Sequence, residues 1–218
     1  MSRPSEGHHI TLGILVSGSG TNLQAIIEEI EAGRLSAHIG MVISNVEGCR
    51  AVDRCRKHQI PVRVITHQSF SSRKAFEQAL IDQFEEVSTD LICLAGFMRL
   101  LSPYFVQHYA GKLLNIHPSL LPAFPGLDAQ RQAFTYGVKI TGATVHFVDV
   151  GTDTGPIVLQ EAVPVHDTDS AESLALRILH IEHQIYPKAI QLFAEGRLTL
   201  RGRKVETCIN RSPASPTR

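Results

Sequence analysis

The stretch Ile10-Thr-Leu-Gly-Ile-Leu-Val16 leads into the turn Ser17-Gly-Ser-Gly-Thr-Asn22 and then into Leu23-Gln-Ala-Ile-Ile-Glu-Glu-Ile30. The first segment is an apolar run of strand length. The last segment carries apolar residues at positions 23, 26, 27 and 30, which is the spacing of one helix face. A strand, a glycine-rich turn and an amphipathic helix in this order indicate the opening unit of an α/β fold.

The turn between this strand and helix differs from the two common phosphate-binding motifs. Leu23 occupies the position of the third glycine in the dinucleotide fingerprint, and the Gly-Lys-Ser/Thr ending of a P-loop is absent. Backbone N–H groups that converge at a helix N-terminus can still bind one phosphate. The turn is therefore a candidate phosphate cradle, and a simple tight turn is the alternative.

The rest of the chain continues to alternate between strand-like and helix-like segments. Predicted strands cover 37–44, 62–65, 90–94, 112–117, 140–148 and 157–163, and predicted helices cover 51–58, 71–84, 103–109, 129–136 and about 170–195, before a small hairpin at 198–205. This order predicts a mostly parallel, doubly wound central sheet flanked by helices, with a Rossmann-like N-terminal half. We expect a single domain over 10–202, with 1–9 and 203–218 as flexible termini.

The composition excludes several classes of function. The 218 residues include 21 basic and 21 acidic ones, so no general attraction to nucleic acid or to a membrane surface is expected. The four cysteines show no zinc-binding spacing, and the pair His180 and His183 lacks a third ligand, so no metal site is predicted. Such cysteine usage, with no apolar targeting or membrane-spanning run, favours a cytoplasmic protein.

A second stretch, Leu114-Asn-Ile-His-Pro118, presents polar side chains at the end of a predicted strand. Strand alternation places Asn115 and His117 on one face, and Pro118 ends the pairing. The turn Asp149-Val-Gly-Thr-Asp-Thr-Gly-Pro156 follows another strand-like run. Ligands of α/β sheets bind beyond the strand ends, so we expect these groups to share one site. An amide, an imidazole and a carboxylate suit oxyanion stabilisation and proton transfer, whereas an ordinary loop histidine is the alternative.

Four segments together resemble one family, the phosphoribosylglycinamide formyltransferases among the folate-dependent formyltransferases. They are Ser17-Gly-Ser-Gly-Thr-Asn-Leu-Gln24, Leu94-Ala-Gly-Phe-Met-Arg-Leu-Leu-Ser-Pro103, Leu114-Asn-Ile-His-Pro-Ser-Leu-Leu-Pro122 and Asp153-Thr-Gly-Pro-Ile157. The resemblance extends over roughly residues 10 to 200. It implies transfer of a formyl group from 10-formyltetrahydrofolate, a co-substrate, to the amine of glycinamide ribonucleotide in purine biosynthesis, without a metal.

The resemblance also implies a role for individual residues. The catalytic set would be Asn115, His117 and Asp153. The ribonucleotide would be bound by Gly20, Thr21 and Asn22 at its phosphate and by Glu182. Positions around the folate would be Arg73, Met98, Arg99, Leu101, Asn115, Asp149, Val150, Gly151, Thr152 and Asp153. Asp128 stands where many relatives have histidine, which leaves the hydrogen bonding beside the site open.

Other functions are weighed against this one. Hydrolysis of 10-formyltetrahydrofolate would use the same three residues on water, but the resemblance implies that such hydrolases carry an extra N-terminal domain. A methionyl-tRNA formyltransferase would need an RNA-binding domain and a basic surface. A serine hydrolase lacks its Gly-x-Ser-x-Gly motif here. A non-catalytic nucleotide-binding module would leave Asn115, His117 and Asp153 unexplained. We therefore expect small-molecule substrates only, bound by a monomer or a homodimer.

Overall fold

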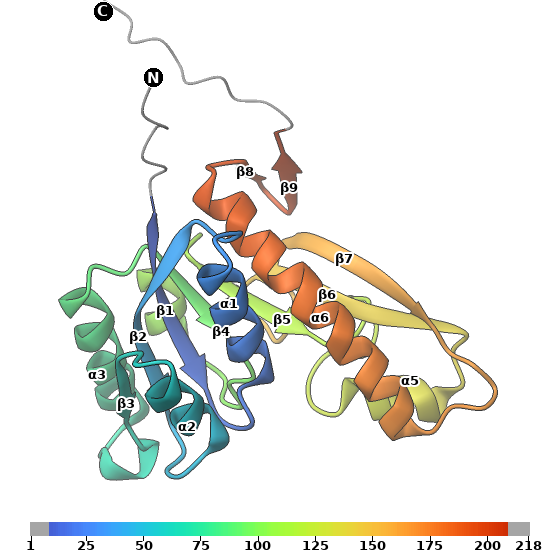
Figure 1. The fold of residues 1–218 in the computed structure, drawn as a ribbon, viewed down its shortest axis with the longest axis horizontal. Coiled ribbons are helices and arrows are strands. Elements are labelled where there is room, and N and C mark those ends of the chain that lie inside the picture. The colour runs from blue at the N-terminus through green and yellow to red at the C-terminus, as the bar shows by residue number, and fades with distance from the viewer. Residues whose placement is uncertain (1–8, 209–218) are drawn as a thin grey trace, which may run out of the picture.

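The computed structural model describes residues 9–208, which form a central sheet with helices on both faces (Figure 1). The strands are β1 (Ile10–Val16), β2 (Ala37–Ser44), β3 (Val62–Val64), β4 (Leu91–Leu94), β5 (Leu113–His117), β6 (Ile140–Phe147), β7 (Ile157–Pro164), β8 (Leu198–Arg201) and β9 (Lys204–Thr207). The helices are α1 (Thr21–Glu31), α2 (Arg50–Lys57), α3 (Arg73–Glu86), α4 (Pro103–His108), α5 (Ala129–Tyr136) and α6 (Ala171–Ala194), with a 3₁₀ turn at His67–Ser69. Within 9–208 no helix combines the length and apolar character needed to span a membrane.

The main sheet has the strand order β3-β2-β1-β4-β5-β6-β7. All pairings from β3 through β5 are parallel, and β6 and β7 are added antiparallel. The prediction of a mostly parallel, doubly wound sheet is confirmed. The chain moves outward from β1 to β3 and then returns to pair β4 with the other side of β1. The loops after β1 and β4 therefore meet at a topological switch point, where Met98 N donates to Ser17 Oγ at 2.9 Å.

Two apolar cores lie on opposite faces of the sheet. One core joins the sheet to buried residues of α1, α2 and α6, such as Ile26, Ala51 and Ile190. The other joins it to α3 and α4 through residues such as Phe84 and Phe105. Strands covered on both faces need apolar side chains in both directions, which explains the continuous apolar run at Leu91–Leu94.

The two longest helices, α3 and α6, begin at serine caps. Ser72 Oγ accepts a hydrogen bond from Ala75 N at 3.1 Å ahead of α3. Ser170 precedes α6 and forms a reciprocal capping box with Ser173. Each cap satisfies a backbone N–H that has no partner inside the helix, so the start of the helix is encoded locally.

Two expectations differ from the structure at the ends of elements. The predicted domain limit at 202 cuts through the β8–β9 hairpin, because β9 covers Lys204–Thr207 and pairs antiparallel with β8. Residues 1–8 and 209–218, which belong to the predicted flexible termini, lie outside the described residues. The second difference concerns β6. It runs antiparallel to β5, so the turn after it does not extend from the carboxyl edge of the parallel strands.

Tyr186 connects α6 to the centre of the sheet. Its side chain is fully buried, and its hydroxyl lies 3.0 Å from both Leu94 O of β4 and Leu114 O of β5. Both carbonyls lie within the two strands that precede the polar loops at this end of the sheet. The hydroxyl therefore fixes the position of α6 over the strands that carry those loops.

We expect Tyr186→Phe to lower the free energy of unfolding by about 1–2 kcal/mol, because it removes one buried hydroxyl and its hydrogen bond while keeping the ring. Urea denaturation measures the change. Tyr136→Phe is the matched control, since Tyr136 is 79% exposed and its hydroxyl is not buried. Equal stability of the two variants would contradict the role of the Tyr186 hydroxyl.

Candidate active site

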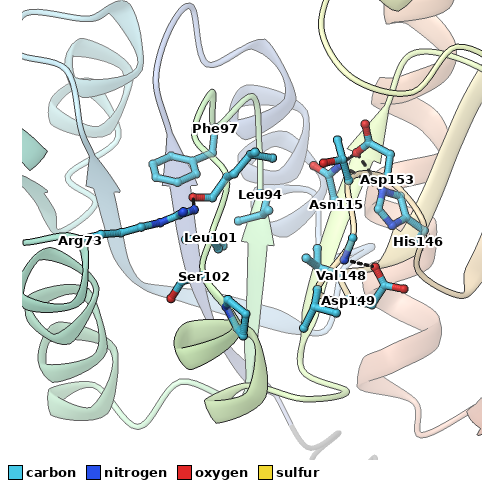
Figure 2. Close-up of a pocket in the computed structure, with 15 residues that line it drawn as sticks. Arg73, Leu94, Phe97, Leu101, Ser102, Asn115, His146, Val148, Asp149 and Asp153 are labelled. Atoms are coloured by element: carbon cyan, nitrogen blue, oxygen red, sulfur yellow. Dashed lines mark hydrogen bonds and ion pairs between the residues drawn. The ribbon is translucent and has the colours of Figure 1, made fainter.

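Polar side chains from β5, β6 and the loop after β6 meet on one side of a cavity (Figure 2). Asn115 and His117 project from β5 on the same face, as strand alternation predicts, while Ile116 packs into the core. Asp153 comes from the loop after β6. The structure thus brings the three predicted catalytic residues together.

Asp153 is the shared contact of this group. Its Oδ2 accepts a hydrogen bond from Gly126 N at 2.8 Å and lies 3.3 Å from His117 Nδ1. Its Oδ1 lies 3.4 Å from Asn115 Nδ2 and 3.7 Å from His146 Nε2. The carboxylate therefore faces four polar groups from three segments of the chain.

The loop around Asp153 reaches these partners by folding back along β6. Phe147 N donates to Pro156 O at 2.9 Å, and Asp153 adopts a left-handed backbone with φ of 53°. A Cβ atom on Gly155 would lie 1.8 Å from Phe147 O, so only glycine fits this close approach. This return of the chain, rather than a shared carboxyl edge, explains how Asp153 reaches β5.

The ring of His117 is held at both nitrogens. Nε2 lies 2.8 Å from Phe124 O, and because a carbonyl can only accept, Nε2 carries a hydrogen. Nδ1 then faces Asp153. Burial lowers the pKa of His117, although Phe124 O and the charge of Asp153 oppose this shift. Protonation of Nδ1 would thus complete an ion pair, but it must overcome the cost of desolvation.

The carboxyl group of Asp153 is ionised at neutral pH. Burial alone raises its pKa, but the hydrogen bond from Gly126 N and the positive charge that the His117 and His146 rings can carry outweigh burial and hold that pKa below its ordinary value. The result is a half-buried negative charge beside two imidazole rings. This charge favours a proton on the His117 ring and so opposes the lowering of its pKa by burial.

His146 belongs to the site although the motifs did not reveal it. It pairs with Asn115 across the β5–β6 ladder and is only 2% exposed. Its Nδ1 lies 2.8 Å from Phe147 O, and its Nε2 lies 3.1 Å from Asn115 Nδ2. Finding it required the antiparallel register of β6, which the local sequence around His146 does not specify.

The cavity beside these residues has a volume of about 250 Å³. Leu94, Phe97, Leu101 and Val148 give it apolar walls, and residues 149–153 also line it. Of the residues predicted around the folate, those that line it are Arg73, Leu101, Asn115, Asp149, Val150, Gly151, Thr152 and Asp153. Apolar walls beside a segment with polar groups suit a flat heteroaromatic ring.

Met98 and Arg99, also predicted near the folate, do not line this cavity. Met98 is 66% exposed and lines a second cavity. The guanidinium carbon of Arg99 lies 5.9 Å from the centroid of the Phe76 ring, a cation–π contact. The side chain of Arg99 therefore contacts α3.

A buried glutamate, Glu77 of α3, fixes the loop at the outer side of the first cavity. It is 1% exposed and accepts from Ser102 N at 2.7 Å. Arg73 Nε lies 3.3 Å from Glu77, and Arg73 also donates to Leu100 O. These bonds hold Arg73 against the loop from Leu100 to Ser102. In the sequence, Glu77 looks like an ordinary helix residue and gave no signal.

The second cavity, of about 440 Å³, lies on the other side of Asn115 and Asp153, which line both cavities. His117, Met98, Gly126 and Asp128 also line it. Asp128 precedes α5 in a left-handed conformation with φ of 56°. Asn115 and Asp153 therefore lie where the contents of two cavities would meet.

The predicted phosphate loop and Glu182 also come together. Gly20 precedes α1 with φ of 68°, and a Cβ there would lie 2.7 Å from Ala51 Cβ. The first N–H groups of α1, at Thr21 and Asn22, have no partners inside the helix and can bind an anion. Asn22 Nδ2 donates to Glu182 at 2.7 Å, whereas Asn22 Oδ1 has no hydrogen-bond partner among the described residues.

No group of three or more His, Cys, Asp or Glu side chains that could hold a metal ion occurs within 9–208. His180 and His183, noted in the sequence, instead line a shallow hollow beside Thr21 together with Arg54.

Comparison with known proteins shows which protein family this chain matches. The model of the formyl transferase family matches residues 11–190. Phosphoribosylglycinamide formyltransferase of Escherichia coli is 44% identical over 187 residues, which are 86% of this chain and 88% of that protein. The solved structure of glycinamide ribonucleotide transformylase 1 from Symbiobacterium toebii has a TM-score of 0.90 at 49% identity, covering 92% of this chain and 95% of that one.

A longer relative is also similar. The trifunctional purine biosynthetic protein adenosine-3 of Bos taurus is 49% identical over 189 residues, which are 87% of this chain. The chain spans 19% of that protein's length.

Burial raises the pKa of Glu182 to about 7 from an ordinary value of 4.5, and the Asn22 hydrogen bond only partly offsets this. The folded protein therefore holds this proton more tightly than the unfolded chain. We expect the free energy of unfolding of the unaltered protein to fall by on the order of 3 kcal/mol, relative to that of Glu182→Gln, as the pH rises from below 4.5 to above 7.

Urea denaturation of both proteins at pH 5 and pH 8 tests this. Glu47→Gln, at an exposed position, is the control and should follow the unaltered protein. Parallel pH dependence of the unaltered protein and Glu182→Gln would contradict the expected shift.

Proposed function

This chain belongs to the formyl transferase family, and we propose that it transfers the formyl group of 10-formyltetrahydrofolate to the amine of 5-phosphoribosylglycinamide in purine (IMP) biosynthesis. One observation carries the proposal. Asn115 and His117 each lie within 3.5 Å of Asp153, and Asn115 and Asp153 line both cavities. An enzyme that joins two substrates needs its reactive groups at such a boundary.

Each substrate has a region whose chemistry fits it. The first cavity offers apolar walls and the segment 149–153 to the folate ring, and Arg73 at its outer side suits a carboxylate of the folate tail. The N-terminus of α1, at Gly20, Thr21 and Asn22, suits the phosphate of the ribonucleotide. Glu182, next to Asn22, can accept hydrogen bonds from ribose hydroxyls.

The reaction forms a C–N bond between the substrate amine and the formyl carbon and breaks the bond from that carbon to the folate nitrogen. Negative charge develops on the formyl oxygen during attack. Asn115 Nδ2–H and His117 Nδ1–H are the donors that can stabilise it. Both face Asp153 across long distances, 3.4 and 3.3 Å, so a more favourable acceptor can take these hydrogens.

Asp153 supports the charged form of His117 and assists proton transfer. Phe124 O already fixes a hydrogen on Nε2, so an added proton resides on Nδ1, the nitrogen that faces both Asp153 and the reacting centre. The proton lost by the attacking amine must reach the departing folate nitrogen. A water held by the carboxylate of Asp153 can carry it there.

The experiment that tests the function follows loss of the formyl group from 10-formyltetrahydrofolate by absorbance, with and without 5-phosphoribosylglycinamide. Loss that requires the ribonucleotide, with formylated product detected by mass, supports the transferase. Loss without the ribonucleotide would identify a hydrolase. Ribonucleotide binding without any loss would identify a non-catalytic binding module.

We expect Asn115→Ala, His117→Ala and Asp153→Ala each to lower kcat by about 10²–10³, the usual cost of losing one oxyanion donor or its support. Steady-state rates measure the loss, and circular dichroism checks that each variant is folded. Asp167→Ala, at a surface position 89% exposed, is the control. Near-normal turnover of His117→Ala would contradict its role.

A further inference from the structure

We propose that His146 is a positioning residue of this reaction: its Nε2 accepts one amide hydrogen of Asn115 and keeps the amide nitrogen directed at the position of the formyl oxygen. The inference rests on the proposed function, and no sequence motif of the site includes His146. Figure 2 shows His146 and Asn115 side by side, with Asp153 next to both.

The backbone fixes which nitrogen of His146 carries a hydrogen. Nδ1 lies 2.8 Å from Phe147 O, and a carbonyl oxygen can only accept, so Nδ1 donates. In the tautomer with Nδ1–H, Nε2 presents a lone pair. That lone pair faces Asn115 Nδ2 at 3.1 Å, a distance within the range of a hydrogen bond.

Two acceptors determine the orientation of the Asn115 amide. One hydrogen of Nδ2 goes to His146 Nε2, and the other points to Asp153 Oδ1 at 3.4 Å. A flipped amide would place Oδ1 against a lone pair and a carboxylate, which is unfavourable on both sides. The amide nitrogen therefore faces the centre of the site.

His146 matters most once substrate is bound. The developing oxyanion would take the Asn115 hydrogen that points to Asp153, so the contact with Asp153 no longer determines the orientation of the amide. Only the contact with His146 then distinguishes the amide nitrogen from the amide oxygen. Without it, the amide can rotate and present its oxygen to the oxyanion, and the donor is lost.

The position of His146 is set by the strands rather than by a mobile loop. Asn115 and His146 are direct partners in the antiparallel β5–β6 ladder, so their side chains project from the same face. The β6–β7 pairing shifts register between Val145 and His146, and such a bulge changes the direction of a side chain. Val145 and Phe147 are buried on either side and restrain the backbone.

Two substitutions separate this role from a structural one. His146→Gln places an amide oxygen near the position of Nε2, where it can accept from Asn115. His146→Asn is shorter and can retain only the hydrogen bond to Phe147 O. We expect kcat to fall about 10–100-fold in His146→Asn, up to the cost of a lost oxyanion donor, and to recover most of that loss in His146→Gln. KM for both substrates should stay within about 3-fold in both variants, because the residue orients a group that acts in the transition state.

A double-mutant cycle and a spectroscopic measurement complete the test. In an Asn115→Ala background, His146→Asn should cause no further loss of kcat, since the group it orients is gone. Independently of turnover, ¹⁵N NMR of the histidine rings should show Nδ1 of His146 protonated and Nε2 unprotonated.

The outcomes distinguish this inference from the proposed function. Absence of formyl transfer by the unaltered protein would overturn the function itself. Transfer by the unaltered protein, combined with equal kcat in His146→Gln and His146→Asn, would overturn only the role of His146. An Nε2–H tautomer in the NMR spectrum, or fully additive losses in the cycle, would also overturn that role.

Discussion

The half-buried carboxylate of Asp153 is the interaction on which the site depends. A negative charge removed from water is costly unless nearby donors compensate for it. Here Gly126 N at 2.8 Å does so, and so does the ring of His117 at 3.3 Å when it is protonated. Because Gly126 belongs to the loop after β5 and Asp153 to the loop after β6, the same charge draws both loops over the sheet. Removal of the carboxylate would therefore release the loops as well as the imidazole.

The mixed character of the sheet explains how these groups come together. Its parallel part provides the switch point between β1 and β4, where the loops that hold Gly20 and Met98 meet. Its antiparallel part adds β6 beside β5 and so places His146 opposite Asn115. A wholly parallel sheet would bring a crossover helix to this edge and could not pair these two side chains directly.

The fold could be predicted further than the site. The local pattern of apolar and polar residues gave β1, β2 and α5 with their observed bounds. The motifs gave Asn115, His117 and Asp153. His146 and Glu77 were missed because their roles come from pairing across strands and from burial under a loop, which a linear pattern does not encode. Arg99 was predicted near the folate, but its side chain lies against Phe76 of α3. A tertiary contact determines where this side chain points, and the sequence pattern does not encode such a contact.

The polar groups of this site are incompletely satisfied in the free protein. Asn22 Oδ1 has no partner within 9–208, Asn115 and His117 reach Asp153 only across 3.4 and 3.3 Å, and burial raises the pKa of Glu182 to about 7. Each such group costs stability, and an ordinary core would not retain it. Desolvation also lowers the pKa of His117, yet a low local dielectric strengthens every hydrogen bond that a bound substrate can make there. The polar groups that cost stability here are thus the same groups that can form hydrogen bonds to a bound substrate.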